Sequence, residues 1–171
     1  DFKKSKNEFL RRTDNCDHIF YLIFTKWSSH ITLEAYAYIR HIKIESIYGE
    51  LIGEDWKNNW TLGSNICNIK NTPDGRRQIN EDCSIRIIDF SDINVAVKTL
   101  EDHFFNVAVP FFEKYSSLDE IDKLYNEPPF DEIPVLVQRT LSEQCMKGLI
   151  VAKMVKRKNY KELVRTFDNS I

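Results

Sequence analysis

The chain has 171 residues, of which 42% are hydrophobic, 29% charged and 12% aromatic. This apolar content offsets the entropy lost on folding, so disorder is excluded, and it fits one globular domain or two small ones. The longest apolar run, over 19–24, is far shorter than the roughly 20 residues of a membrane-spanning helix. The formal net charge of −2 argues against general nucleic-acid binding, because few phosphates would be neutralised.

The spacing of cysteines and glycines excludes several kinds of site. No two cysteines have the separation of a zinc knuckle or a redox dithiol, and we expect free, buried thiols in a reducing compartment at Cys16, Cys67, Cys83 and Cys145. No two glycines are close enough to cradle a phosphate. The sequence therefore predicts no metal and no cofactor. Because no apolar leader follows Asp1, we expect cytoplasmic residence.

The first half of the chain predicts strands. A short strand over 9–13 precedes two long ones, over 16–27 and 30–42, in which apolar and polar residues alternate. After Ile42 the phase changes, which indicates a bend or a short helical turn. Further strands are predicted over 60–70 and 83–90, with a polar loop over 71–82 between them.

The register of the two long strands follows from the Ser28-Ser29 loop, which pairs residues whose numbers sum to 57. Large side chains then oppose small ones on what we define as the core face: Phe20 with Ala37, Leu22 with Ala35, and Phe24 with Leu33. On the reverse, which we define as the aromatic face, Tyr21 and Tyr36 are direct partners and Ile19 lies beside Tyr38.

The aromatic face is the candidate binding site. Tyrosine and tryptophan give large contact areas at low entropic cost, so this face could form a groove for a peptide or a small ligand. The alternative is that another segment covers it. The candidate residues are Tyr21, Trp27, Glu34, Tyr36, Tyr38 and Arg40.

The second half predicts helices. Apolar residues at spacings of three and four begin after Ser91, and Pro110 should kink or restart that helix. Ser117 has the cap spacing of a short helix that ends near residue 125. A proline-rich connector over 127–134 precedes a long helix over 135–156, and Asn159 caps the last helix.

This order of elements predicts an α+β fold, with an N-terminal antiparallel sheet of about five strands backed by a C-terminal layer of about four helices. A single domain over 1–171, mainly strands over 1–90 and mainly helices over 91–171, is preferred to a split near residue 116.

Three segments resemble an uncharacterised bacterial domain-of-unknown-function family. They are the F-K-K start with its F-x-R strand at 9–11, the V-P-F-F-E-K-Y-S-S-L-D-E-I helix break at 109–121, and A-K-M-V-K-R-K-N-Y-K-E-L at 152–163. The resemblance implies an α+β bacterial domain with a further helix before Asp1. It carries over no catalytic residue. Relatives of this style are suspected of roles in toxin–immunity or phage-linked loci, which implies an immunity-like role.

No catalytic residue is predicted. The motifs of serine hydrolases, zinc proteases and β-lactamases are absent. The carboxylate pairs at 119–120 and 131–132 fall in first turns or loops, where helix capping explains them. The predicted register does not bring the four histidines together: His18, His30, His41 and His103.

Charge is distributed unevenly over the helical half. Residues 113–145 contain eight acids and three bases, whereas 146–171 contain seven bases and two acids. Either the two segments neutralise each other, or Lys156, Arg157 and Lys158 form a basic contact surface for an acidic protein or RNA.

Three hypotheses about function remain. The first is a non-enzymatic, cytoplasmic protein-interaction module that binds a protein partner through its sheet face or its acidic helical surface. The second is a small-ligand-binding module that uses the tyrosines. The third is an enzyme of unrecognised type, with His18, His30 or His103 beside Glu34 or Asp102. Neither nucleic acid nor membrane is an expected partner, and the sequence does not assign an oligomeric state.

Overall fold

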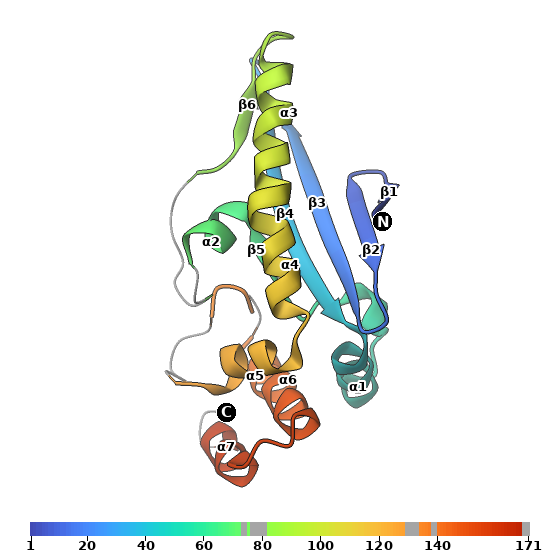
Figure 1. Ribbon diagram of the computed structural model, residues 1–171, viewed down its shortest axis with the longest axis vertical. Helices are drawn as coiled ribbons and strands as arrows, with labels where there is room; N and C mark the ends of the chain where they lie inside the picture. The colour runs from blue at the N-terminus through green and yellow to red at the C-terminus, as the bar shows by residue number, and fades with distance from the viewer. Residues whose placement is uncertain (73–74, 76–81, 129–133, 138–139, 169–171) are drawn as a thin grey trace.

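The computed structural model describes residues 1–72, 75, 82–128, 134–137 and 140–168, and it confirms the α+β fold (Figure 1). The described residues form an antiparallel sheet of six strands in the order β1-β2-β3-β4-β5, with β6 also paired to β4. Two long central strands and four short ones make up the sheet: β1 (Lys3–Ser5), β2 (Glu8–Arg12), β3 (Cys16–Lys26), β4 (Ile31–His41), β5 (Leu62–Asn65) and β6 (Ile85–Ile87).

The central hairpin has the predicted register. Tyr21 pairs with Tyr36 and Phe20 with Ala37, and the Trp27 amide donates to the His30 carbonyl across the two-residue loop. The alternation of apolar and polar residues selects this register, because a slip by one residue would turn every apolar side chain to the other face.

One member of the predicted core face is exposed. The side chains of Phe20, Leu22, Leu33, Ala35 and Ala37 are buried, whereas Phe24 is 52% exposed. The prediction that Phe24 lies in the core is therefore wrong. Phe24 projects from the end of the hairpin, where α3 contacts β6 instead of covering β3.

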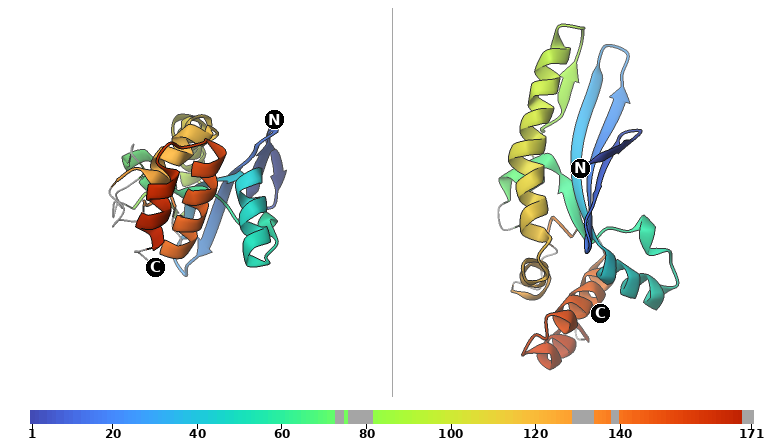
Figure 2. Two further views of the ribbon diagram at one scale, coloured as in Figure 1. Left: turned by 90° about the horizontal axis from the view of Figure 1, so that it is seen from below. Right: turned by 45° about the vertical axis from the view of Figure 1, so that its right-hand side comes forward.

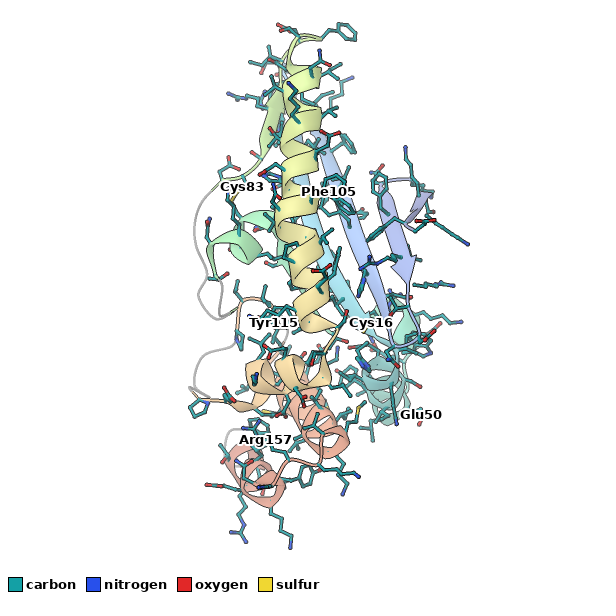
Figure 3. All side chains as sticks on the ribbon, in the orientation of Figure 1. Cys16, Glu50, Cys83, Phe105, Tyr115 and Arg157 are labelled. Carbon is teal, nitrogen blue, oxygen red and sulfur yellow. A yellow bond between two sulfur atoms is a disulfide. The ribbon has the colours of Figure 1, made fainter. Side chains whose placement is uncertain are left out.

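One edge of β4 is shared by two short strands. β5 pairs with residues 36–39 of β4 and β6 pairs with residues 31–33, which leaves 34–35 between them. Both short strands run antiparallel to β4, so the end of β5 and the start of β6 approach each other at this gap. Cys67 lies two residues after β5 and Cys83 two residues before β6, and they form a disulfide (Figure 3 labels Cys83).

The prediction of four free thiols is therefore wrong for two of them. Cys16 and Cys145 are free and buried. Cys67 and Cys83 are 16 residues apart, and only the shared edge of β4 brings them together.

A long helix covers part of one sheet face (Figures 1 and 2). It consists of α3 (Asp92–Asp102), a π-helical stretch (His103–Ala108) and α4 (Val109–Tyr115). A restart at Pro110 was expected, and α-helical hydrogen bonding does start again there, although the long helix itself is not interrupted. Pro110 lies in the first turn of α4, directly after the π-helical stretch, where the altered hydrogen-bond pattern accommodates its missing N–H.

Two helices in the first half are more extensive than predicted. Where a bend or a short helical turn was expected, α1 (Ile42–Ile52) is a full helix, and Gly53 ends it at a φ of 74°. The predicted strand over 60–70 is wrong in its second half, because α2 (Ile66–Asn71) begins there. The Asn65 side chain caps α2 by accepting a hydrogen bond from the Asn68 amide at 2.8 Å.

The remaining helices gather with α1 at the end of the sheet opposite the hairpin tip (Figures 1 and 2). They are α5 (Leu118–Asn126), α6 (Leu141–Met154) and α7 (Tyr160–Asp168). α6 begins six residues later than predicted, because Thr140 caps it by accepting from the Glu143 amide. Residues 129–133 and 138–139 of the predicted connector and helix lie outside the described residues. So do most of the 71–82 loop and the carboxylate pair at 131–132.

The acidic segment 113–145 and the basic segment 146–171 are joined by an ion pair. Arg157 forms an ion pair with Asp122 of α5 and also donates to Asn159. Within the described residues, no helix is both long and apolar enough to cross a membrane.

Candidate functional site

The aromatic face carries a row of rings. Tyr36 and Tyr38 stack with ring centroids 6.1 Å apart, and Tyr38 meets Trp60 at 4.7 Å. Gly63 pairs with Tyr38 on the neighbouring strand. A Cβ on Gly63 would lie 2.1 Å from a ring carbon of Tyr38, so the missing side chain leaves room for the ring.

The long helix packs on the opposite side of the sheet, and this face has no helix of the described residues over its upper part (Figure 2). Tyr21 is 36% exposed, while Tyr36 and Tyr38 are half-buried by their neighbours. Burial, followed by the nearby phenols of Tyr36 and Tyr21, raises the pKa of Tyr38 to about 12. Burial also raises the pKa of Tyr36, so Tyr36 and Tyr38 are neutral contact groups and not acid–base groups at neutral pH.

The other predicted members of the face have separate roles. Arg40 donates to Asp17 at 2.9 Å and to the Asn59 carbonyl at 2.7 Å, so its charge is used within the fold. Trp27 lies at the hairpin tip and donates to Thr32 Oγ1 at 3.0 Å.

Glu34 is half-buried and borders a cavity of about 50 Å³ beside the disulfide. The structure thus brings together Tyr21, Tyr36 and Tyr38. Trp27 lies apart from them, and the Arg40 guanidinium is engaged by Asp17 and the Asn59 carbonyl.

A serine and a histidine lie close together on the core side of the sheet. His18 Nε2 is 2.7 Å from Ser116 Oγ, which is the separation of a nucleophile and its base. Arg11, however, donates to His18 Nδ1 at 3.1 Å, so the proton of the neutral ring is on Nε2 and is donated to Ser116. Ser116 in turn donates to the Phe112 carbonyl at 2.6 Å.

The proton direction is therefore opposite to that of an activated serine. Burial and then the Arg11 charge lower the pKa of His18 to about 4, so the ring stays neutral. Burial also raises the pKa of the neighbouring Cys16 thiol to about 11, which disfavours the reactive thiolate. This cluster ties β2 and β3 to the end of α4 and gives no sign of a reactive centre.

The other histidines do not assemble a site. His30 contacts Ser29 at the hairpin loop, His41 pairs with Cys16 in the sheet, and burial lowers the pKa of His103. Among the residues that the structure describes, no group of three or more His, Cys, Asp or Glu side chains could hold a metal ion.

A buried charged cluster joins α1 to α6. Lys147 lies 2.9 Å from both Glu45 and Glu143 and donates to the Trp60 carbonyl at 3.0 Å. Its ammonium group also lies 4.8 Å from the Tyr48 ring centroid. Because the side chains of Lys147 and Glu45 have almost no access to solvent, the cluster stabilises the junction and has no room for a substrate. The sequence alone did not reveal it, since no spacing rule links 45 to 147.

An apolar slot lies between the long helix and the first three strands. Its volume is about 350 Å³. The side chains that form it come from the N-terminus, β2, β3 and the long helix, and they are Phe2, Phe9, Phe20, Leu22, Val97, Leu100, Glu101, Phe104 and Phe105. Glu101 is the one charged group among these lining residues. Phe105 is 63% exposed, at the level of the slot in Figure 3.

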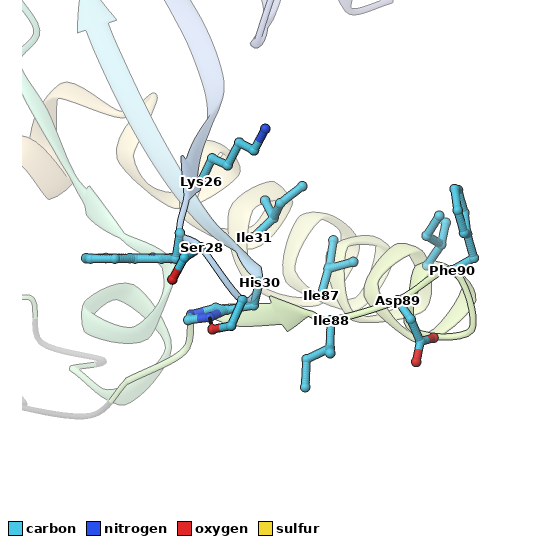
Figure 4. A pocket seen from close by; sticks show the side chains of 11 residues that line it. Lys26, Ser28, His30, Ile31, Ile87, Ile88, Asp89 and Phe90 are labelled. Carbon is cyan, nitrogen blue, oxygen red and sulfur yellow. Dashed lines mark hydrogen bonds between the residues drawn. The ribbon is translucent and has the colours of Figure 1, made fainter.

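A second hollow of about 380 Å³ lies at the hairpin tip (Figure 4). The β3–β4 loop with Ile31 of β4 forms one wall, and β6 with the segment leading into α3 forms the other, including Ile87, Ile88 and Phe90. Phe90 is 90% exposed. This hollow and the slot lie toward the same end of the sheet, with residues 93–97 of α3 between them.

Exposed apolar side chains concentrate in this region. Of the twelve large hydrophobic residues that are markedly exposed in the described part of the chain, nine belong to the hairpin tip, the segment between β6 and α3, and the long helix. We define these nine as the distal apolar surface: Phe24, Trp27, Ile31, Ile88, Phe90, Ile93, Val95, Val97 and Phe105. The sequence analysis missed this surface, apart from Trp27, because it placed Phe24 in the core and assigned Ile93 and Val97 to a buried stripe.

No family model, curated protein or solved structure matches the chain. The resemblance to an uncharacterised bacterial family therefore stays a prediction.

Proposed function

We propose that the protein is a non-enzymatic protein-interaction module that binds its partner through the distal apolar surface. The observation that carries the proposal is the gathering of nine exposed large hydrophobic residues at one end of the molecule. Isolated exposed apolar residues are ordinary, but their gathering in one region, where several of them line two hollows, is typical of an interaction surface. A partner that covered this group would remove its apolar area from water, which favours association.

The chemistry of the polar clusters supports the non-enzymatic part of the proposal. The Ser116–His18 hydrogen bond has the wrong proton direction for nucleophile activation, and Lys147 is enclosed with its two carboxylates. These groups are paired with one another within the fold, so each has a structural explanation.

An immunity-like role fits such a module. A protein that neutralises a toxin needs a specific binding surface and no catalytic group of its own, which agrees with the features above. A toxin-like neighbouring gene would support this role, and its absence would count against it.

The aromatic face is a second candidate surface, for a small ligand or a flat protein epitope. Its support is the row formed by exposed Tyr21 and half-buried Tyr36 and Tyr38 on a side of the sheet that the long helix leaves open. A ligand specific to this face would protect the protein against heat in a concentration-dependent manner, and Tyr21→Ala would remove that protection.

The disulfide bears on where the module works. The sequence favoured the cytoplasm, where thiols are kept reduced. The Cys67–Cys83 bond favours an oxidising compartment instead, and we propose that the protein functions there.

The main proposal is tested by comparing tagged wild-type protein with Phe90→Glu, Phe105→Glu and Leu51→Glu in capture experiments from a native extract. Leu51 is the matched control, because it is 66% exposed but lies on α1, away from the distal apolar surface. We expect a specific partner to be retained by wild type and Leu51→Glu and lost by the other two variants. Equal capture by all four proteins would contradict the proposal.

A further inference from the structure

We propose that the apolar slot receives an amphipathic helix of a partner protein, and that acidic side chains flank the apolar face of that helix. This inference rests on the proposed function, since it names the kind of partner that the same end of the molecule binds.

The first argument is the space beside the long helix. A helix with its side chains is about 10–12 Å wide and strands lie about 4.8 Å apart, so one helix covers roughly two strands. The long helix lies along β4 and contacts β6 and β4. In the described part of the chain, no second helix covers β1 and β2 on this side (Figures 1 and 2). The uncovered strip therefore has about the width of one more helix.

The second argument is the pattern of the slot walls. On the long helix, Val97, Leu100, Glu101, Phe104 and Phe105 line the slot at spacings of three and four, which forms a ridge parallel to the helix axis. The ridge from 97 to 105 is about 12 Å long. A partner helix lying alongside this ridge would place its own apolar stripe on the strand residues of the slot, as in other helix-in-groove complexes.

The third argument is charge. Side chains of a strand alternate between the two faces, and the pairings place Lys4 beside Phe9 and Phe9 beside Phe20 on the slot side. By the same alternation, Arg11 and Lys26 also face this side. All three charged residues on the slot side of β1–β3 are basic, although the whole chain carries a net charge of −2.

These bases remain available to a partner. Lys4 and Lys26 are exposed. Arg11 contacts the His18 ring nitrogen and lies 5.1 Å from the centre of the Phe2 ring, and both of these groups are neutral. Glu101 supplies the opposing charge on the helix wall. Three bases lie on this side of the sheet, with Lys26 toward the hollow at the hairpin tip, against the single acid of the slot lining, so electrostatic complementarity favours an acidic amphipathic helix.

The test uses the full chain and two fluorescently labelled synthetic peptides of 18 residues. Both carry the same leucine and phenylalanine stripe at helical spacing, and the flanking positions are glutamate in one peptide and lysine in the other. Binding is followed by fluorescence anisotropy at low and at physiological salt. We expect the acidic peptide to bind wild type about tenfold more tightly than the basic peptide at low salt, with a smaller difference at higher salt.

Two variants and a control locate the binding. Lys4→Glu/Lys26→Glu should weaken the acidic peptide about tenfold and favour the basic one, whereas Phe105→Glu should abolish binding of both. Leu51→Glu should leave both affinities unchanged. Circular dichroism and thermal unfolding establish that each variant is folded, and the exposure of the four substituted residues makes this expected.

The outcomes separate this inference from the proposed function. If both peptides bind equally and the double reversal has no effect, the acidic helix is overturned, while loss of native partner capture in Phe105→Glu would still support the module. If neither peptide binds, the helical occupant is overturned. If a fatty acid of 12 carbons binds saturably and neither peptide does, the slot belongs to a small ligand and the inference is again overturned.

Discussion

Removal of the Cys67–Cys83 disulfide should destabilise the protein by about 3 kcal/mol. The two cysteines are 16 residues apart, and a cross-link that closes a loop of this length removes about 10 cal/mol/K of entropy from the unfolded chain, or about 3 kcal/mol at room temperature. The bond also fastens the segment before β6 to the start of α2, beside the gap in the β4 edge. Its loss therefore frees β6, which forms one wall of the hollow at the hairpin tip.

The assay is urea unfolding of oxidised wild type and of Cys67→Ser/Cys83→Ser, each with and without reductant. For a slope of about 2 kcal/mol/M, a loss of 3 kcal/mol lowers the midpoint by about 1.5 M. The double variant is its own control, because reductant should not change its midpoint. In denatured, non-reduced wild type, we expect only Cys16 and Cys145 to react with a thiol reagent. Four reactive thiols, or a stability change below about 0.5 kcal/mol, would refute the reasoning.

Three further predictions concern buried groups. Lys147→Met leaves two buried carboxylates without their cation and should lower the free energy of unfolding by about 3–5 kcal/mol; a loss below about 1 kcal/mol in urea unfolding would contradict this. Gly63→Ala would place a Cβ 2.1 Å from the Tyr38 ring and 2.6 Å from the Ala37 carbonyl oxygen. We therefore expect the free energy of unfolding to fall by about 1–3 kcal/mol. An unchanged melting temperature would contradict this and show that the ring moves freely. The folded-state pKa of His18 is lowered from 6.5 to about 4. Its contribution to stability should therefore be complete above pH 6.5 and decline as the pH falls toward 4. His18→Gln should flatten the dependence of the free energy of unfolding on pH in this range, and an unchanged dependence would assign it to other groups.

The central hairpin could be predicted in detail because its information is local. Period-two alternation identified both strands, and the two-residue loop fixed the pairing of Tyr21 with Tyr36. Burial of Phe24 could not be settled in this way. Its side of the strand was predicted correctly, but its exposure depends on how far the long helix covers the sheet, which is a tertiary property.

Short helices in the first half were missed for a related reason. The apolar residues at the start of α1 and α2 follow strands directly, and short apolar runs do not distinguish a strand from a helix. The capping signals were present, with Gly53 at the end of α1 and Asn65 at the start of α2. Giving such local signals more weight than the continuing apolar run would have located both helices.

The disulfide illustrates the limit of spacing rules. Its two cysteines flank the gap on β4 only because both β5 and β6 pair with that strand, and neither pairing was specified by the sequence pattern. The buried Lys147 cluster has the same origin, since Glu45 and Lys147 meet through the packing of α1 on α6.

The slot depends both on the local alternation of side chains along the strands and on tertiary packing. Alternation along the strands already places Lys4, Arg11 and Lys26 on the side of Phe9 and Phe20, so the basic character of that side follows from the register alone. In a fully covered sheet, these bases would be buried without carboxylate partners, which is costly. They are tolerated because the long helix leaves this strip open. Lys4 and Arg11 therefore agree with the lack of a further helix of the described residues over β1 and β2, and with our proposal of an acidic helix as the partner there.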